Sequence, residues 1–385
     1  MQKNWDNSDP IEICPVHTRR QRRAFAVFPW RIYKDDPLWV PPLVRDRLKA
    51  FDKSRHRFYR HGDAEFCAAH RRGRMVGTVC VAEDRFHNQE LGKREAMFGY
   101  FDCIDDEEVA RALFDHAESC ARKRGLERIV GPFNLDYEDR YGVLLDGRDR
   151  RPAILCGHSP KYYRGFFERY GFEPARAVNI ALGMDFREGT NELRRLAKLA
   201  ESIQKRGRFT VREADFKRWD EEISTVHRLM NESLKVLPDF IPLSVDDVHE
   251  IADGFKEVAD PRLILFVDRG DETIGWIAAI PDFNEHLARL NGLRFPWDYL
   301  RLPFVLRRRL RAASMKSILM VPEHHRTGAI IPALDQIAKR LIEGGYEWLD
   351  FSLTSEDNPQ TPYIARKFGA EIYKRYQVYA KDITS

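Results

Sequence analysis

The sequence predicts an α/β (α+β) fold with two tandem lobes, each a mixed, mostly antiparallel, twisted sheet flanked by helices. Three observations support this prediction. The chain has 385 residues, more than one ordinary hydrophobic core holds and enough for two domains. Hydrophobic residues make up 43% and charged residues 32%, the balance of a globular protein. A strand–turn–strand pattern occurs twice, and each copy precedes a strand, a long amphipathic helix and a further strand.

The repeated pattern begins with a predicted β-hairpin, because apolar and β-branched runs flank a turn that contains glycine. The two copies of the hairpin cover residues 64–70 with 75–84, and residues 262–267 with 273–282. The strand, helix and strand that follow are predicted at 96–103, 107–124 and 128–131, and at 317–321, 330–343 and 348–353. Gly125 and Gly345 stand where the helices should end. Short closing helices are predicted at 162–170 and 362–367.

These copies predict a first lobe over residues 1–186, a charged helical linker over 187–208 and a second lobe over 209–385. The net charge of +4 does not favour a nucleic-acid partner. The six cysteines lie in the first half without the close spacing of metal ligands, so we expect buried, reduced thiols and no metal. Because no secretory signal or long apolar span is apparent, we expect a cytoplasmic protein.

The order of elements resembles that of the GNAT (Gcn5-related N-acetyltransferase) fold. In that family, the loop that binds the pyrophosphate of coenzyme A (CoA) lies between the central strand and the long helix. This position reads Val-Pro-Glu-His-His-Arg-Thr-Gly-Ala-Ile over residues 321–330. Val321, Pro322, Glu323 and Gly328 match the family pattern, whereas His325 replaces an Arg or Gln and Ile330 replaces a small residue.

The resemblance implies an acyl-CoA co-substrate, acetyl-CoA or a longer chain, held by the second lobe. Backbone N–H groups near the end of the central strand would stabilise the oxyanion. The residues expected to hold the cofactor are Met320, Val321, His325, Arg326, Thr327, Gly328, Ala329, Ile330 and Asn358.

The equivalent position in the first lobe reads Phe-Asp-Cys-Ile-Asp-Asp-Glu-Glu over residues 101–108. Its acids would cap the following helix but repel a pyrophosphate. We therefore expect the first lobe to act as a scaffold and as a wall of the acceptor site.

As a whole, residues 20–380 are similar to bacterial double-GNAT proteins, some of which resemble bacterial ceramide synthases. This resemblance implies an acyl-CoA-dependent N-acyltransferase whose acceptor is a primary amine, either a small molecule or a lipid-like amine such as a long-chain base. Two alternatives stay open. One is a transferase that uses aminoacyl-tRNA, and the other is a non-catalytic pseudoenzyme that binds a lipid or a partner.

Many members of the family protonate the leaving thiolate with a tyrosine in the last helix. The matching positions here hold Phe167 and Ala365, so the usual acid is absent from both lobes. A histidine on a Gly/Pro loop has an accessible pKa for general-base work, which makes His158 a candidate. A surface histidine without a catalytic role is the alternative, and the composition of the loop slightly favours it.

Further catalytic candidates are Tyr363, Glu356 and Asp350, although a tyrosine in such a helix also serves packing. Asn134 and Asp136 lie just past a predicted strand end, where an acceptor amine could be recognised, although ordinary turn chemistry also explains them. Tyr162 and Tyr163, at the start of the predicted closing helix, are further candidates for substrate binding.

Residues 295–311 combine large apolar residues with five arginines against a single acid, Asp298. This composition is typical of a segment that lies on an anionic membrane. An amphipathic helix that covers the second core explains it as well. The first interpretation predicts peripheral binding to the inner face of the membrane.

Overall fold

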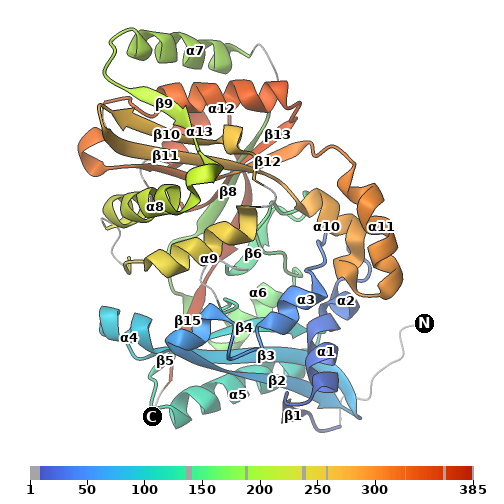
Figure 1. Ribbon diagram of the computed structural model, residues 1–385. Coiled ribbons are helices and arrows are strands. Elements are labelled where there is room, and N and C mark those ends of the chain that lie inside the picture. The colour runs from blue at the N-terminus through green and yellow to red at the C-terminus, as the bar shows by residue number, and fades with distance from the viewer. Residues whose placement is uncertain are drawn as a thin grey trace. The chain divides into compact units, whose positions relative to one another are not determined.

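The computed structural model describes residues 9–135, 141–186, 190–235, 240–256, 259–325, 327–358 and 361–383. In these residues, mostly antiparallel strands form one sheet of seven strands and one of eight, both flanked by helices (Figure 1). The predicted fold class is confirmed.

The first sheet has the order β1-β2-β3-β4-β5-β15-β7. Its strands are β1 (Glu12–Pro15), β2 (Gly62–Arg71), β3 (Arg74–Asp84), β4 (Glu95–Cys103), β5 (Arg128–Gly131), β7 (Glu173–Pro174) and β15 (Tyr379–Asp382). The second sheet has the order β6-β14-β8-β13-β12-β11-β10-β9. Its strands are β6 (Val143–Asp146), β8 (Asn179–Asp185), β9 (Thr210–Glu213), β10 (Ile264–Arg269), β11 (Glu272–Pro281), β12 (Ala312–Met320), β13 (Trp348–Ser355) and β14 (Glu371–Gln377).

The helices of the first half are α1 (Arg19–Val27), α2 (Pro29–Ile32), α3 (Val44–Lys49), α4 (Arg85–Leu91), α5 (Glu107–Lys123) and α6 (Tyr163–Tyr170). Those of the second half are α7 (Asn191–Gln204), α8 (Trp219–Leu234), α9 (Val245–Lys256), α10 (Asn284–Leu290), α11 (Pro296–Leu306), α12 (Ile331–Glu343) and α13 (Thr361–Lys367). Short 3₁₀ turns occupy Arg57–Arg60, Phe216–Arg218, Pro261–Leu263, Asn291–Leu293 and Pro322–His324.

The internal repeat is confirmed in three dimensions. The hairpin β2–β3 is followed by α4, β4, α5 and β5, and the hairpin β10–β11 by α10, α11, β12, α12 and β13. In each copy the long helix connects two parallel strands, β4 with β5 and β12 with β13. Gly125 and Gly345 follow these helices at φ +71° and +63°, the left-handed conformation that a glycine adopts at low cost. Strand β12 begins five residues earlier than predicted.

The first sheet has an apolar layer on each face. Cys67, Val79 and Phe98 face α5 and α6, whereas Phe66 and Cys80 belong to the opposite layer, with Phe25 of α1 and Phe51 after α3. The alternation along each strand sets this division, because successive side chains point to opposite faces. In the second sheet, α12 packs against β10 and β11, and α8 packs against β11 and β12 (Figure 1).

The chain forms two compact units that are not consecutive in sequence. The first comprises residues 1–179, 286–307 and 374–385, and the second comprises residues 180–285 and 308–373. Trp30 shows how a distant segment joins the first unit, because its Nε1 donates to Asn291 Oδ1 at 2.7 Å. The final strand β15 likewise pairs with β5 of the first sheet. The boundaries predicted at residues 186 and 208 stay a prediction.

Among the helices of the described residues, none combines the length and the apolar character needed to span a bilayer.

Candidate functional site

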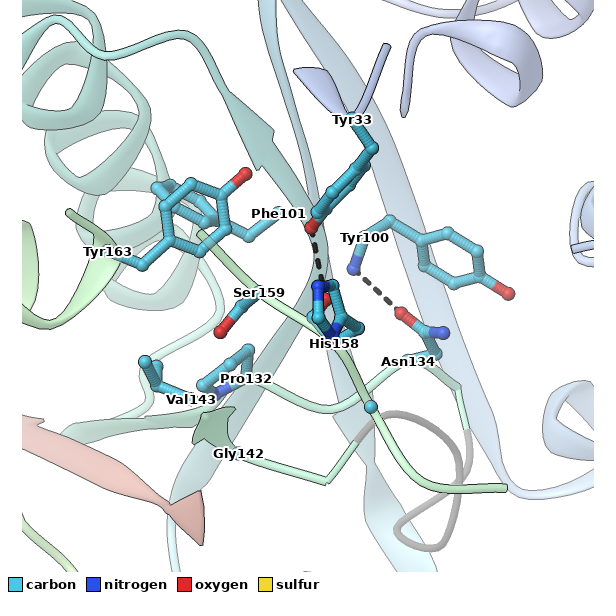
Figure 2. A pocket seen from close by; sticks show the side chains of 11 residues that line it. Tyr33, Tyr100, Phe101, Pro132, Asn134, Gly142, Val143, His158, Ser159 and Tyr163 are labelled. Atoms are coloured by element: carbon cyan, nitrogen blue, oxygen red, sulfur yellow. Dashed lines mark hydrogen bonds between the residues drawn. The ribbon is translucent and has the colours of Figure 1, made fainter. Parts of the chain in front are cut away.

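A pocket in the first unit is lined by residues from six separate stretches of the chain (Figure 2). Its volume of about 40 Å³ holds a few waters or one small polar group. The residues that line it are Tyr33, Tyr100, Phe101, Pro132, Asn134, Gly142, Val143, Gly157, His158, Ser159 and Tyr163.

The most reactive group of this pocket is an imidazole paired with a carboxylate. His158 Nε2 lies 2.7 Å from Asp36 Oδ2, and the histidine side chain is only 4% exposed. Because an ionised carboxylate can only accept, Nε2 carries the proton and Nδ1 holds a lone pair in the neutral ring. Nδ1 is buried and has no hydrogen-bond partner among the described residues. The pair therefore contains a neutral imidazole whose Nδ1 makes no hydrogen bond to the described residues and can act as a base.

Local structure holds both partners of the pair. Asp36 begins a turn in which its Oδ1 accepts the N–H of Leu38 at 2.9 Å. Tyr33 stacks on Trp39, with ring centroids 4.9 Å apart and planes at 9°. The Tyr33 hydroxyl donates to the carbonyl of His158 at 3.1 Å (Figure 2). Residues 33–39 thus fix the backbone of the histidine as well as its ring.

Burial sets the protonation state of the pair. Desolvation lowers the pKa of His158 below its ordinary value of 6.5, against the raising effect of Asp36, and the nearby charges of Lys374 and Arg148 lower it further. Burial would raise the pKa of Asp36, but the hydrogen bonds from His158 and Leu38 outweigh it, so this pKa is lowered. At neutral pH the site therefore holds a carboxylate and a neutral imidazole.

Asn134 shapes the pocket by closing a kink in the central strand of the first sheet. Tyr100 lies at φ +45°, and its N–H donates to Asn134 Oδ1 at 3.0 Å (Figure 2). A Cβ on Gly99 would lie 1.3 Å from the carbonyl oxygen of Phe133. Only glycine therefore lets the segment that carries Asn134 pass so close to β4. Asp136 lies outside the described residues.

Tyr162 and Tyr163 anchor α6 to the end of β4. Tyr163 accepts the N–H of Cys103 at 2.8 Å through its hydroxyl oxygen, and Tyr162 donates to the carbonyl of Cys103 at 2.8 Å. Burial raises the pKa of both phenols well above the ordinary value. Both phenols are therefore neutral, and their hydrogen bonds hold the start of α6 against the end of β4. Tyr163 also lines the pocket.

The start of α5 is occupied by the protein itself. Asp106 Oδ1 accepts the N–H groups of Glu108 and Val109 at 3.0 and 3.2 Å. The buried guanidinium of Arg71 binds Asp106 at 2.6 Å and Glu108 at 2.8 Å. A carboxylate therefore already fills the place of an anion at this helix N-terminus.

The start of α12 in the second unit differs. Ile330 occupies the N-cap position, and in the described chain no side chain provides a capping hydrogen bond there. Gly328 lies at φ +76°, and a Cβ on it would approach Ile203 Cδ1 to 3.1 Å. Within the loop, Ala329 donates its N–H to Thr327 Oγ1 at 3.3 Å. Arg326 lies outside the described residues.

Two other predicted cofactor residues are tied to the strand end. His325 Nε2 donates to the carbonyl of Met320 at 2.7 Å, which folds the imidazole back onto β12. The N–H of Val321 donates to the carbonyl of Ile274 at 2.9 Å. The Val321 N–H, one of the groups expected to stabilise an oxyanion, is therefore already hydrogen-bonded within the sheet.

The remaining candidates lie in the second unit. Asp350 is fully buried, and its carboxylate accepts from the Ser314 hydroxyl, the Ser352 N–H at 2.9 Å and the Tyr373 hydroxyl at 2.8 Å. Such a network favours a structural role. Asn358 Oδ1 accepts the N–H of Thr361 at 3.4 Å, near the start of α13.

Glu356 is exposed, and so is Tyr363, at 59% of its surface. Lys367 Nζ lies 4.4 Å from the ring centroid of Tyr363. The structure thus brings His158, Asn134 and Tyr163 into one pocket of the first unit, and it places Asp350, Glu356 and Tyr363 in the second unit.

Sequence reasoning did not pair Asp36 with His158 or assign Tyr33 to this pocket, and these two residues complete it. The only signal in the sequence was their position in an aromatic and proline-rich run, residues 28–42. Their distance of more than 120 residues from His158 hid the pairing.

Comparison with known proteins gives two relatives that span nearly the whole chain. A bacterial ceramide synthase of Caulobacter vibrioides is 29% identical and covers 97% of this chain and 98% of its own. Protein YghO of Escherichia coli is 28% identical, with coverage of 94% and 93%. No family model matches the sequence.

Solved structures show the same architecture at low sequence identity. A tandem GNAT protein from the clavulanic acid biosynthesis pathway covers 98% of this chain and 99% of its own, with 12% identity and a TM-score of 0.57. A GCN5-related N-acetyltransferase from Sphaerobacter thermophilus covers 97% and 96%, with 11% identity and a TM-score of 0.52. The chain therefore has the fold of the tandem GNAT proteins.

Proposed function

We propose that the protein is an acyltransferase that moves an acyl group from an acyl-CoA thioester to a primary amine. The observation that carries this proposal is the Asp36–His158 pair with its unused Nδ1. An alkyl amine is mostly an ammonium ion at neutral pH and must lose a proton before it attacks. A neutral imidazole held by a carboxylate takes that proton.

The proposed reaction forms one bond and breaks one bond at the carbonyl carbon. The amine nitrogen attacks the thioester carbonyl carbon, and the C–N bond forms as the C–S bond breaks. His158 Nδ1 accepts the first ammonium proton and passes it to solvent, and it accepts the second proton that the nitrogen loses as the amide forms. The CoA thiolate leaves and is protonated. For that last proton, the exposed Tyr363 and Glu356 stay candidates.

The second unit is the proposed site of the CoA pyrophosphate. The support is the contrast between the two helix starts: α5 is capped by Asp106, whereas α12 begins without a side-chain cap in the part of the chain that the structure describes. Converging N–H groups and the helix dipole favour an anion at such a start. The loop residues Thr327–Ile330, with His325 and Arg326, would hold it, and Asn358 stays a candidate.

A lipid-like amine is the proposed acceptor. Two features support this choice: the similarity to a bacterial ceramide synthase and the exposed face of α11. Of ten exposed large hydrophobic residues in the described chain, α11 carries five: Trp297 (60%), Tyr299 (51%), Leu300 (74%), Phe304 (69%) and Leu306 (52%).

Trp297, Leu300 and Phe304 follow one another at helical spacing and form an apolar stripe. Exposed Arg301 and Arg307 flank this stripe, whereas Arg309 and Arg311 bind the Gly344 carbonyl and Glu347. We propose that the helix lies on an anionic membrane, from which the acceptor would be drawn.

Replacing His158 tests the proposed base. In H158A, kcat for release of CoA from a long-chain acyl-CoA, with a long-chain amino alcohol as acceptor, should fall about 10²- to 10⁴-fold. In H17A, which removes an exposed histidine, kcat should not change. Because the base works only when it is unprotonated, the wild-type rate should fall as the pH drops through a value below 6.5. Equal rates for H158A and the wild type would contradict the role.

Replacing Gly328 tests the donor site. G328V should weaken the binding of CoA at least about tenfold, because a side chain at positive φ distorts the loop where the backbone meets the phosphates. G270V is the matched control, since Gly270 also has positive φ but lies in the open turn between β10 and β11. Calorimetric titration with CoA should separate the two variants. An equal loss in both would rule out a specific site at Gly328.

Removing the stripe on α11 tests membrane docking. The triple variant W297S/L300S/F304S should no longer float with vesicles that contain phosphatidylglycerol, whereas L199S, at an exposed leucine of α7, should float like the wild type. R301E/R307E should weaken binding about tenfold or more and reduce its dependence on salt. If the wild-type protein does not float with anionic vesicles, the proposal is refuted.

A further inference from the structure

Four side chains with metal-ligating atoms meet between β2 and α5 of the first unit. Glu65 Oε1 lies 3.5 Å from Cys67 Sγ and 3.8 Å from Cys120 Sγ. His116 Nε2 lies 3.5 Å from Glu65 Oε1 and 3.3 Å from Cys120 Sγ. Glu65, Cys67 and His116 have their ligand atoms all within 4.8 Å of one another. The cluster takes no part in the pocket at His158.

The fold creates this cluster from two short spacings. Glu65 and Cys67 are two apart on a strand and His116 and Cys120 are four apart on a helix, so each pair shares a face of its element. Helix α5 packs on the face of the sheet that carries Cys67. The expectation of no metal came from cysteine spacing alone, and the two thiols are 53 positions apart in the sequence.

Four of the six separations between these ligand atoms fit a tetrahedral zinc ion. Zinc binds thiolate sulfur at about 2.3 Å and imidazole nitrogen or carboxylate oxygen at about 2.0–2.2 Å, so tetrahedral ligand atoms lie roughly 3.5 Å apart. The four distances above, 3.3–3.8 Å, have this length. Two thiolates, an imidazole and a carboxylate form a donor set that favours zinc over magnesium or calcium.

We propose that Glu65, Cys67, His116 and Cys120 bind a structural zinc ion that fastens α5 to β2. Binding replaces two thiol protons, which are released to solvent, and two thiolates, one carboxylate and Zn²⁺ leave a net charge of −1. Lys123 and Arg124, whose positive charges act on His116 and Cys120, offset that charge. The ion would cross-link segments about 50 residues apart and would contribute directly to folding stability.

Metal uptake by the full chain tests this site. Protein purified anaerobically without chelators should contain one zinc per chain by elemental analysis. Cobalt in place of zinc should give the intense visible bands of tetrahedral coordination and the near-ultraviolet bands of thiolate ligation. C67A and C120A should weaken zinc binding at least about 100-fold.

C80A is the matched control, because Cys80 lies on the neighbouring strand but faces the opposite apolar layer. It should keep one zinc per chain. If the buried cysteine variants fail to fold, H116Q at a more exposed ligand should still fold and lose the cobalt spectrum.

Added zinc should raise the unfolding temperature of metal-free wild type and of C80A but not that of H116Q. Wild type without submicromolar zinc affinity, or equal zinc loss in C80A and C67A, would overturn the proposal. These readouts do not depend on acyl transfer.

Discussion

The hydrogen bond between His158 and Asp36 is the constraint on which the pocket of the first unit depends. It fixes the proton on Nε2, and because burial keeps the ring neutral, it leaves Nδ1 as a base. Neither residue would do this alone: a buried histidine without the carboxylate could take either tautomer, and Asp36 without His158 would lose its main hydrogen-bond donor. The stacking of Tyr33 on Trp39 holds the pair in place.

A second constraint is the asymmetry between two equivalent helix starts. In the first copy, Asp106 and Arg71 turn the start of α5 into a closed ion-pair network. In the second copy, the four residues directly before α12 (327–330) are uncharged, and no side chain of the described residues caps the helix. The chain contains two similar frames, and a carboxylate, that of Asp106, occupies the helix start in the first of them. The proposal that the second unit holds the acyl-CoA donor, and that the first unit serves the acceptor, rests on this difference.

Most of the fold could be predicted from the sequence because the repeat is local. Alternation in the hairpins, the amphipathic pattern of α5 and α12, and the glycines after both helices are all visible within short windows. The site was harder to predict from the sequence, because its decisive contacts join residues that are far apart along the chain. His158 was a candidate but Asp36 was not, and the cluster of Glu65, Cys67, His116 and Cys120 came from two elements whose contact no spacing reveals.

Nuclear magnetic resonance of the protein with ¹⁵N-labelled histidine tests the central claim most directly, since it reports both the tautomer and the pKa of His158. We expect a ring protonated at Nε2 at neutral pH, with a pKa below 6.5 that falls further in D36N as the negative charge is lost. A ring protonated at Nδ1, or a pKa above 6.5, would contradict it.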